Sequence, residues 1–213
     1  IAVAERRIDV ALQPQASLAD GSIIGFEALA RWQDGTEWVP PQEFVGIAED
    51  VGLAQGLGTV VMNRALGVMA MMLAEGLQPG RLAVNVSTAQ LLADDFVGTI
   101  TTLLDRHGIH PGQFEIEVTE TVLLDRSIAH IQNTLTRLRQ LGIALAMDDF
   151  GTGYASMSHL TAFPVDRIKV DTRFTAAIDG ACDGGGNSGL IARTLIALGP
   201  GLGWGVVAEG VET

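Results

Sequence analysis

The sequence predicts an α/β fold built on a parallel sheet, and a closed barrel fits it better than an open sheet. Short apolar strands alternate with helical segments along most of the 213 residues, an order typical of parallel sheets. The predicted strands end in acidic, amide or lysine side chains. A barrel points the carboxyl ends of its strands to one face, so these side chains would share a rim. An open doubly wound sheet, the alternative, would spread them along an edge.

Composition supports a globular domain and excludes several other classes. Hydrophobic residues make up 47% of the chain and charged residues 18%, which is typical of a chain that folds around a core. The formal net charge of -12 excludes an overall basic footprint for duplex nucleic acid. Cys182 is the one cysteine, so no intrachain disulfide forms and a reducing cytosolic setting fits. The apolar stretch 59–77 is interrupted by Asn63, Arg64 and Glu75 and indicates a core helix, not a membrane span.

The first third of the chain predicts a hairpin followed by two helices. Residues 1–7 have the pattern of a helix end, and the chain, which begins at Ile1, is interpreted as a piece of a longer protein. Strands are expected at 9–13 and 23–31, and the turn signal around Gly21 would join them as an antiparallel hairpin. Pro41 suits the first turn of a helix that runs to Asp50, and a second helix is expected at about 56–74.

The rest of the chain alternates regularly between strands and helices. We expect strands at 82–86, 114–119, 143–147, 167–171 and 204–208. We expect helices at 93–107, 127–141, 156–162, 174–178 and 190–198. The glycine-rich segment 179–189 breaks the helical pattern, and the glycines at 199–205 indicate a helix stop.

Two adjacent carboxylates, Asp148 and Asp149, follow the buried apolar strand at 143–147. Neighbouring carboxylates repel each other unless a cation lies between them, and a divalent metal on oxygen ligands is the usual solution. Gly151 and Gly153 then allow the backbone to turn sharply, and Ser156 would cap the next helix. The alternative is a capped loop in which the aspartates are simply solvated.

Side chains from six predicted strands would converge at the rim of a barrel: Glu27, Asn85, Glu117, Asp148 with Asp149, Lys169 and Glu209. Carboxylate and amide oxygens suit Mg²⁺ or Mn²⁺ better than zinc, which prefers histidine and cysteine. Two such ions form a phosphoester-cleaving arrangement, because they clamp a phosphate and activate a water. Lys169 would hold that water, offset charge on the phosphate, or pair with neighbouring aspartates.

These residues lie in motifs that together resemble the EAL domain family. In chain order the motifs are Glu27-Ala28-Leu29 with Arg31-Trp32, Asn85-Val86-Ser87, Glu117-Val118-Thr119-Glu120, Asp148-Asp149-Phe150-Gly151-Thr152-Gly153, Ile168-Lys169-Val170-Asp171 and Glu209-Gly210-Val211-Glu212-Thr213. The resemblance implies a TIM-like (β/α)8 barrel that forms a single domain over residues 1–213. Its first strand would be antiparallel to the others, and its C-terminal strand and helix would be missing from this chain.

The resemblance also implies an activity and partners. It implies a phosphodiesterase that converts cyclic di-GMP to linear 5′-pGpG with Mg²⁺ or Mn²⁺, two ions in each site. It further implies a homodimer, attached sensory or GGDEF-type domains, and a cytoplasmic position in a parent protein that can be anchored in the inner membrane.

Carried over by position, the resemblance assigns roles to individual residues. It implies that the metal ligands are Glu27, Asn85, Glu117, Asp148 and, for the second metal, Asp149. Glu27, Lys169 and Glu209 would be catalytic: Lys169 would contact the attacking water, and Glu209 would act as a ligand or a base. Glu120 would anchor the loop 149–156. The residues implied to bind substrate are Gln13, Leu29, Arg31, Asp171 and Glu212.

Two departures from the family pattern bear on activity. The final strand and helix are absent, and so is a glutamine that the family places near the metal-bound water. Two hypotheses follow: an active phosphodiesterase, or a catalytically inactive receptor that binds cyclic di-GMP and signals elsewhere. Every mapped ligand is present together with Lys169 and Glu120, which favours the enzyme. A metal-dependent barrel that cleaves another phosphoester is a third option.

Overall fold

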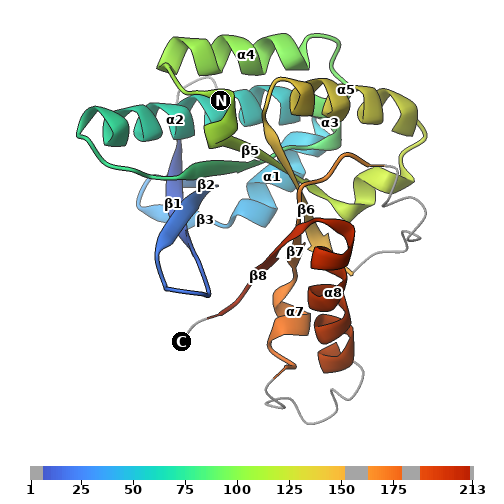
Figure 1. Ribbon diagram of the computed structural model, residues 1–213. Helices are drawn as coiled ribbons and strands as arrows, with labels where there is room; N and C mark the ends of the chain where they lie inside the picture. Colours follow the sequence, from blue (N-terminus) through green and yellow to red (C-terminus); the bar gives the residue numbers. More distant parts are fainter. Residues whose placement is uncertain (1–6, 152–162, 179–187, 212–213) are drawn as a thin grey trace. The chain divides into compact units, whose positions relative to one another are not determined.

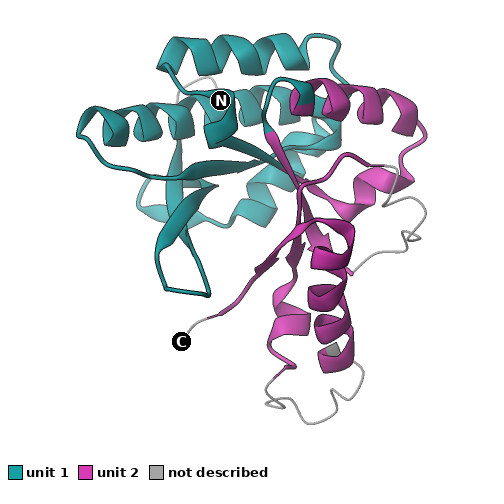
Figure 2. Ribbon diagram, in the orientation of Figure 1, with its two compact units in different colours: residues 1–116, 140–143 teal, residues 117–139, 144–213 magenta. Residues whose placement is uncertain are grey.

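The computed structural model describes residues 7–151, 163–178 and 188–211, which fall into two compact units (Figure 2). Unit 1 comprises residues 1–116 and 140–143, and unit 2 comprises residues 117–139 and 144–213. Several predictions lie outside the described residues: the helix end at 1–6, the helix at 156–162 with its Ser156 cap, and most of the glycine-rich segment at 179–187.

The strands of unit 1 are organised around a long antiparallel hairpin (Figure 1). Strands β1 (Ile8–Ala16) and β2 (Ile23–Asp34) pair with Ile8 opposite Trp32, which confirms the predicted hairpin and lengthens both strands. Strand β4 (Arg81–Asn85) pairs with β2 in parallel. A short strand, β3 (Glu37–Val39), folds back on β2 after a turn at Gly35, whose φ is 62°. It was not predicted, because three residues are too few to show a period.

The helices of unit 1 are α1 (Pro41–Asp50), α2 (Ala54–Ala74), α3 (Thr88–Leu91) and α4 (Phe96–His107), with a 3-10 turn η1 (Pro111–Gln113). The helix predicted at 93–107 begins later, at Phe96, and a separate α3 precedes it. Ser87 explains α3, since its hydroxyl accepts from the Gln90 backbone while the Gln90 side chain accepts from the Ser87 N–H. This reciprocal capping box starts a helix that a search for hydrophobic periodicity misses.

Helix α2 packs as a core helix. Its residues Met62, Ala65, Leu66 and Met69 are all at most 1% exposed, and the helix contacts β1, β4 and α4. Among the described residues it is the one helix long and apolar enough, by length and composition, to cross a membrane. Helices α2 and α4 lie side by side (Figure 1).

The strands of unit 2 form a parallel sheet in the order β6 (Ala144–Phe150), β7 (Arg167–Val170) and β8 (Gly205–Ala208). The preceding strand, β5 (Phe114–Thr119), has the predicted bounds, and its last three residues belong to unit 2. One correction concerns β6, which was expected to end at Met147. It continues through both aspartates to Phe150, and its register with β7 shifts between Met147 and Phe150. That irregularity lets polar residues extend a buried strand.

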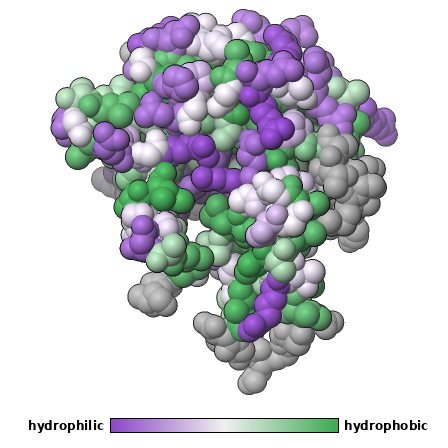
Figure 3. Space-filling view, viewed as in Figure 1, coloured by the Kyte–Doolittle hydropathy of each residue, from purple (hydrophilic) through white to green (hydrophobic). Residues whose placement is uncertain are grey.

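The helices of unit 2 are the 3-10 segment η2 (Glu120–Leu124), α5 (Ile128–Gln140), α7 (Thr172–Thr175) and α8 (Ser188–Leu202). Helix α5 buries Ile131, Leu135 and Leu138, which are spaced as one helical face. Helices α7 and α8 lie side by side (Figure 1). Figure 3 shows hydrophobic surface in the region of α8, where Leu190 is 64% exposed.

The helix stop predicted from the glycines at 199–205 is confirmed, but helix α8, expected to end at residue 198, extends to Leu202. Helix α8 continues through Gly199 and Pro200, and the chain turns at Gly203, whose φ is 76°. A side chain at Gly199 would lie 2.2 Å from a methyl carbon of Val206. The glycine is therefore required for close packing of α8 on β8 and does not end the helix.

Candidate metal centre

A buried lysine lies at the centre of an acidic cluster in unit 2. The Lys169 side chain is 2% exposed, and its Nζ lies 2.8 Å from Glu117 Oε2, 2.9 Å from Glu209 Oε1 and 3.2 Å from Asp148 Oδ1. Glu117 is fully buried and Asp148 nearly so. Burying charges of one sign is costly unless they are paired, and the ammonium supplies the counter-charge. Four of the predicted site residues are thus brought together.

The strand order explains why these four residues meet. Glu117 lies on β5, Asp148 on β6 and Lys169 on β7, while Glu209 follows the last residue of β8. The Glu209 N–H donates to the Val170 carbonyl at 3.1 Å, which continues the ladder between β7 and β8 by one residue. Because β6, β7 and β8 are parallel, their carboxyl ends lie at one edge. Within this unit, the carboxyl ends of neighbouring strands bring these four side chains together.

A second group of carboxylates overlaps the first and offers a set of metal ligands. One oxygen each from Asp148, Asp149 and Glu209 lies within 4.8 Å of the others. The Asp149 N–H donates to Asp148 Oδ1 at 2.9 Å, and the φ of Asp149 is 54°. Aspartate tolerates this left-handed conformation better than most residues, but at some cost. An all-oxygen set of this kind suits a hard divalent cation such as Mg²⁺ or Mn²⁺.

Two neighbouring aspartates differ in their electrostatics. Burial, the charge of Asp148 and a side-chain hydrogen bond with Asp171 raise the pKa of Asp149. Burial opposes ionisation of Asp171 most strongly, yet hydrogen bonds from Arg173 outweigh it and lower the pKa of Asp171. The Arg173 N–H and Nε donate to Asp171 Oδ1 at 2.7 Å and 2.9 Å. As pH falls, Asp149 is therefore protonated before Asp171.

Glu120 lies at the start of η2, directly after β5. Its side chain is buried, and its Oε2 accepts a hydrogen bond from the Gly151 N–H at 3.1 Å. This contact lies at the beginning of the loop 149–156 that Glu120 was predicted to anchor. Residues 152–156 lie outside the described part of the chain, so the anchoring of the rest of the loop stays a prediction.

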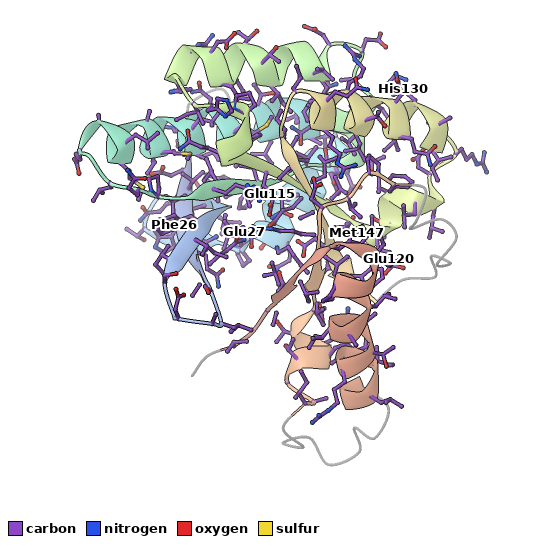
Figure 4. All side chains as sticks on the ribbon, in the orientation of Figure 1. Phe26, Glu27, Glu115, Glu120, His130 and Met147 are labelled. Atoms are coloured by element: carbon purple, nitrogen blue, oxygen red, sulfur yellow. The ribbon has the colours of Figure 1, made fainter. Side chains whose placement is uncertain are left out.

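Two more predicted ligands are joined within unit 1. Glu27 lies in the middle of β2 (Figure 4) and Asn85 is the last residue of β4. The Asn85 Nδ2 donates to Glu27 Oε1 at 2.8 Å, so the amide fixes the orientation of the carboxylate. Gln13, predicted to bind substrate, lies opposite Glu27 in the register of β1 and β2.

Arg31, another predicted substrate contact, lines a cavity of about 590 Å³ in unit 1. Leu29 lies between Glu27 and Arg31 on β2. Two other residues that line this cavity, Asp9 and Trp38, were not predicted. Asp9 lies opposite Arg31 in the hairpin. Extending the predicted pairing of the two strands to Arg31 would therefore have identified Asp9. Glu212 lies outside the described residues.

A buried acid in unit 1 was also not predicted. Glu115 is 1% exposed and pairs with Arg81 at 3.2 Å (Figure 4). It is two positions before Glu117 on β5, and alternate residues of a strand share a face. The signal was therefore present in the sequence, as acidic residues at two alternate positions of one strand.

Comparison with known proteins gives a consistent result along the whole chain. The sequence model described as the EAL domain matches residues 1–213. An uncharacterized signaling protein of Caulobacter vibrioides is 39% identical over 212 residues, which cover 99% of this chain and 25% of that protein. A cyclic di-GMP phosphodiesterase of Pseudomonas aeruginosa is 35% identical over 210 residues, 98% of this chain and 35% of that protein. The chain thus spans about a quarter to a third of these relatives.

The solved structures include a close match in fold. The PaMucR phosphodiesterase, solved as a complex with cyclic di-GMP, has a TM-score of 0.90 and 32% sequence identity. The match covers 100% of this chain and 84% of that one. It confirms the predicted TIM-like α/β fold, here without the complete barrel, and the antiparallel pairing of β1 with β2 agrees with the expected orientation of the first strand.

Proposed function

Because this chain belongs to the EAL domain family, we propose that it is a metal-dependent phosphodiesterase that hydrolyses cyclic di-GMP to linear 5′-pGpG. The observation that carries the proposal is the cluster in unit 2, where Glu117, Asp148 and Glu209 surround Lys169. A structural relative named as a phosphodiesterase holds cyclic di-GMP, and a sequence relative carries that activity in its name. Both support this substrate.

The cofactors we propose are two Mg²⁺ or Mn²⁺ ions. Four carboxylates in unit 2, Glu117, Asp148, Asp149 and Glu209, stand against the single ammonium of Lys169, and this negative excess favours divalent cations. Glu27 and Asn85 would complete the ligand set, as the family resemblance implies. When bound, such ions act as Lewis acids, which offset the charge of the phosphodiester and activate a water.

The residues we propose to act on the reacting atoms are Glu27, Lys169 and Glu209. Lys169 would contact the attacking water, and Glu209, whose side chain is 26% exposed, would accept the proton of that water. The water oxygen bonds to phosphorus while the P–O3′ bond breaks, and the 3′ oxygen takes a proton from solvent and leaves as a hydroxyl. The residues proposed to hold the dinucleotide are Gln13, Leu29, Arg31, Asp171 and Glu212, and Glu120 is proposed to hold the loop.

We place this activity in a larger signalling protein. The chain spans 25% of a relative named as a signaling protein, which supports attached sensory or GGDEF-type domains. The two units are proposed to form one EAL-type domain at residues 1–213, on the cytoplasmic side of a parent protein that can be anchored in the inner membrane. A homodimer is proposed as the active assembly.

Turnover tests the proposal directly. The protein is first freed of metal with EDTA and then supplied with Mg²⁺ or Mn²⁺. It should convert cyclic di-GMP to the linear dinucleotide, and chromatography measures the product. Ca²⁺ should inhibit, because it adopts a larger and looser coordination than Mg²⁺. Tight binding without product in either metal would favour the receptor, and a different preferred phosphoester would favour the third option.

A further inference from the structure

The Lys169 ammonium lies among three carboxylate oxygens, an arrangement that would also suit a metal ion. It contacts one oxygen on each of Glu117, Asp148 and Glu209 at 2.8–3.2 Å. Two of these acids, Asp148 and Glu209, also belong to the group whose oxygens converge closely enough for a metal. The carboxylates that bind the ammonium are therefore in part those that would bind the cofactor.

The sequence shows that this position is the one place in the chain where a lysine is used. Of the 13 basic residues in Lys and Arg, all but Lys169 are arginine. An ammonium is a compact point charge, whereas a guanidinium is a broad planar fork that suits bidentate pairing with one carboxylate. A centre with three carboxylates around one point favours the compact cation, as it would favour a metal ion.

We propose that the Lys169 ammonium occupies a cation position of the metal-free cluster and competes with divalent cations for Asp148 and Glu209. Metal binding is then an exchange at these carboxylates and not the filling of an open site. The inference rests on the proposed metal dependence of the activity. Competition with the ammonium would lower the affinity of the cluster for metal. The fraction of protein with metal bound would then follow the concentration of available Mg²⁺ or Mn²⁺.

Removing the ammonium should strengthen metal binding. A buried positive charge a few ångströms from the ligand oxygens repels an incoming divalent ion, and in a partly buried site this repulsion changes the affinity by at least about tenfold. A scaffolding role predicts the opposite, because three carboxylates without their counter-ion would move apart and bind metal less well.

Calorimetric titration of the EDTA-treated protein with Mn²⁺ separates the two roles. Lys169→Met removes the charge and shortens the side chain by only one atom, and we expect it to bind Mn²⁺ at least about tenfold more tightly than the unchanged protein. Arg137→Met removes the same charge from an exposed position on α5 and should change the affinity less than about twofold. Equal or weaker binding by Lys169→Met would overturn the proposal.

A second measurement uses the unchanged protein, so it does not depend on the folding of a variant. With lysine labelled by ¹⁵N, the chain gives a single side-chain ammonium signal, since Lys169 is its one lysine. Saturable movement of that signal on adding Mg²⁺ supports exchange, and an unmoved signal while calorimetry records binding overturns it. Neither readout uses cyclic di-GMP, so an inactive protein that shows exchange would contradict only the proposed function.

Discussion

At the scale of single residues, Asp149 combines an uncommon backbone conformation with an electrostatic cost. Its φ of 54° lies in the left-handed region, and burial together with the charge of Asp148 raises its pKa. A raised pKa in the folded state means that the ionised form is less favourable there than in the unfolded chain. A bound cation would offset the repulsion between the two carboxylates, and backbone strain and shifted pKa values are both common at functional sites.

The stability of the metal-free protein should therefore depend on Asp149 in a pH-dependent way. A carboxyl whose pKa is raised in the folded state contributes its full stability at pH values below its unfolded pKa of 3.8. This contribution is lost as pH rises through the folded pKa, so the ionised carboxylate lowers the stability of the folded state at neutral pH. Asp149→Asn removes the charge and tolerates the left-handed φ. In EDTA at neutral pH we expect a higher thermal midpoint for Asp149→Asn than for the unchanged protein, with the difference shrinking toward pH 4.

The control for this prediction is Asp105→Asn, which removes one negative charge from an exposed position on α4. It should not reproduce the effect. Identical midpoints of Asp149→Asn and the unchanged protein between pH 4 and neutral pH would contradict the cost assigned to the Asp149 carboxylate.

The sequence predicted the position of a single residue well where that position depends only on the end of a strand. Asp148, Lys169 and Glu209 were predicted from that rule, and the structure gathers them. Arg173 was not predicted, because its pairing with Asp171 depends on the cap of α7 and not on a period. The simultaneous contact of Lys169 with several acids could not be predicted from the sequence either, because it depends on how far side chains extend between neighbouring strands.

At the scale of elements, Asp166 joins three parts of unit 2. Its Oδ1 pairs with Arg139 on α5 at 3.0 Å, and its Oδ2 accepts from the Leu145 N–H on β6 at 3.0 Å. Its backbone N–H and carbonyl bond Leu145 and Gly205 at the starts of β6 and β8. The residue before β7 therefore fixes the register of the sheet that carries the acidic cluster.

Asp166→Ala and Arg139→Ala should differ in their effect on stability. Asp166→Ala leaves the part-buried Leu145 N–H without its acceptor, a loss of about 1–3 kcal/mol in the free energy of unfolding. Arg139→Ala removes an ion pair whose arginine side chain is 53% exposed, and such pairs contribute less than about 1 kcal/mol. Urea unfolding of the two variants measures both values. A larger loss for Arg139→Ala than for Asp166→Ala would show that the ion pair, not the backbone bond, holds the register.

Elements with a clear apolar pattern were predictable from sequence, and elements set by turns and caps were not. Strand β5 and helices α1 and α2 lie within two residues of their expected bounds, because their apolar runs and proline signals are long and unambiguous. The missed elements β3, α3, η1 and η2 have three to five residues each. They are set by turns and caps, and such local hydrogen bonds leave little trace in hydrophobic periodicity.

At the scale of the whole molecule, composition and the alternation of elements were enough to predict the fold class, and the ordered motifs predicted the family. The structure adds how the predicted ligands are distributed. Glu117, Asp148, Asp149, Lys169 and Glu209 lie in unit 2, and Glu27 with Asn85 lies in unit 1. Contact within each group follows from strand pairing, whereas the joint action of the two groups is a functional proposal.

Single substitutions in each unit test that joint action. If residues of both units serve one reaction, Glu27→Ala in unit 1 and Asp148→Ala in unit 2 should each lower turnover of cyclic di-GMP more than about a hundredfold, since a lost metal ligand removes several kcal/mol of transition-state stabilisation. Because Asp148→Ala also removes one partner of the buried Lys169 ammonium, the thermal midpoint of each variant is measured to verify that it is folded. Glu49→Ala, at an exposed position on α1, should keep its activity. Turnover retained by Glu27→Ala but lost by Asp148→Ala would confine the catalytic machinery to unit 2, because the carboxylate of Glu27 would then have no part in holding metal or substrate.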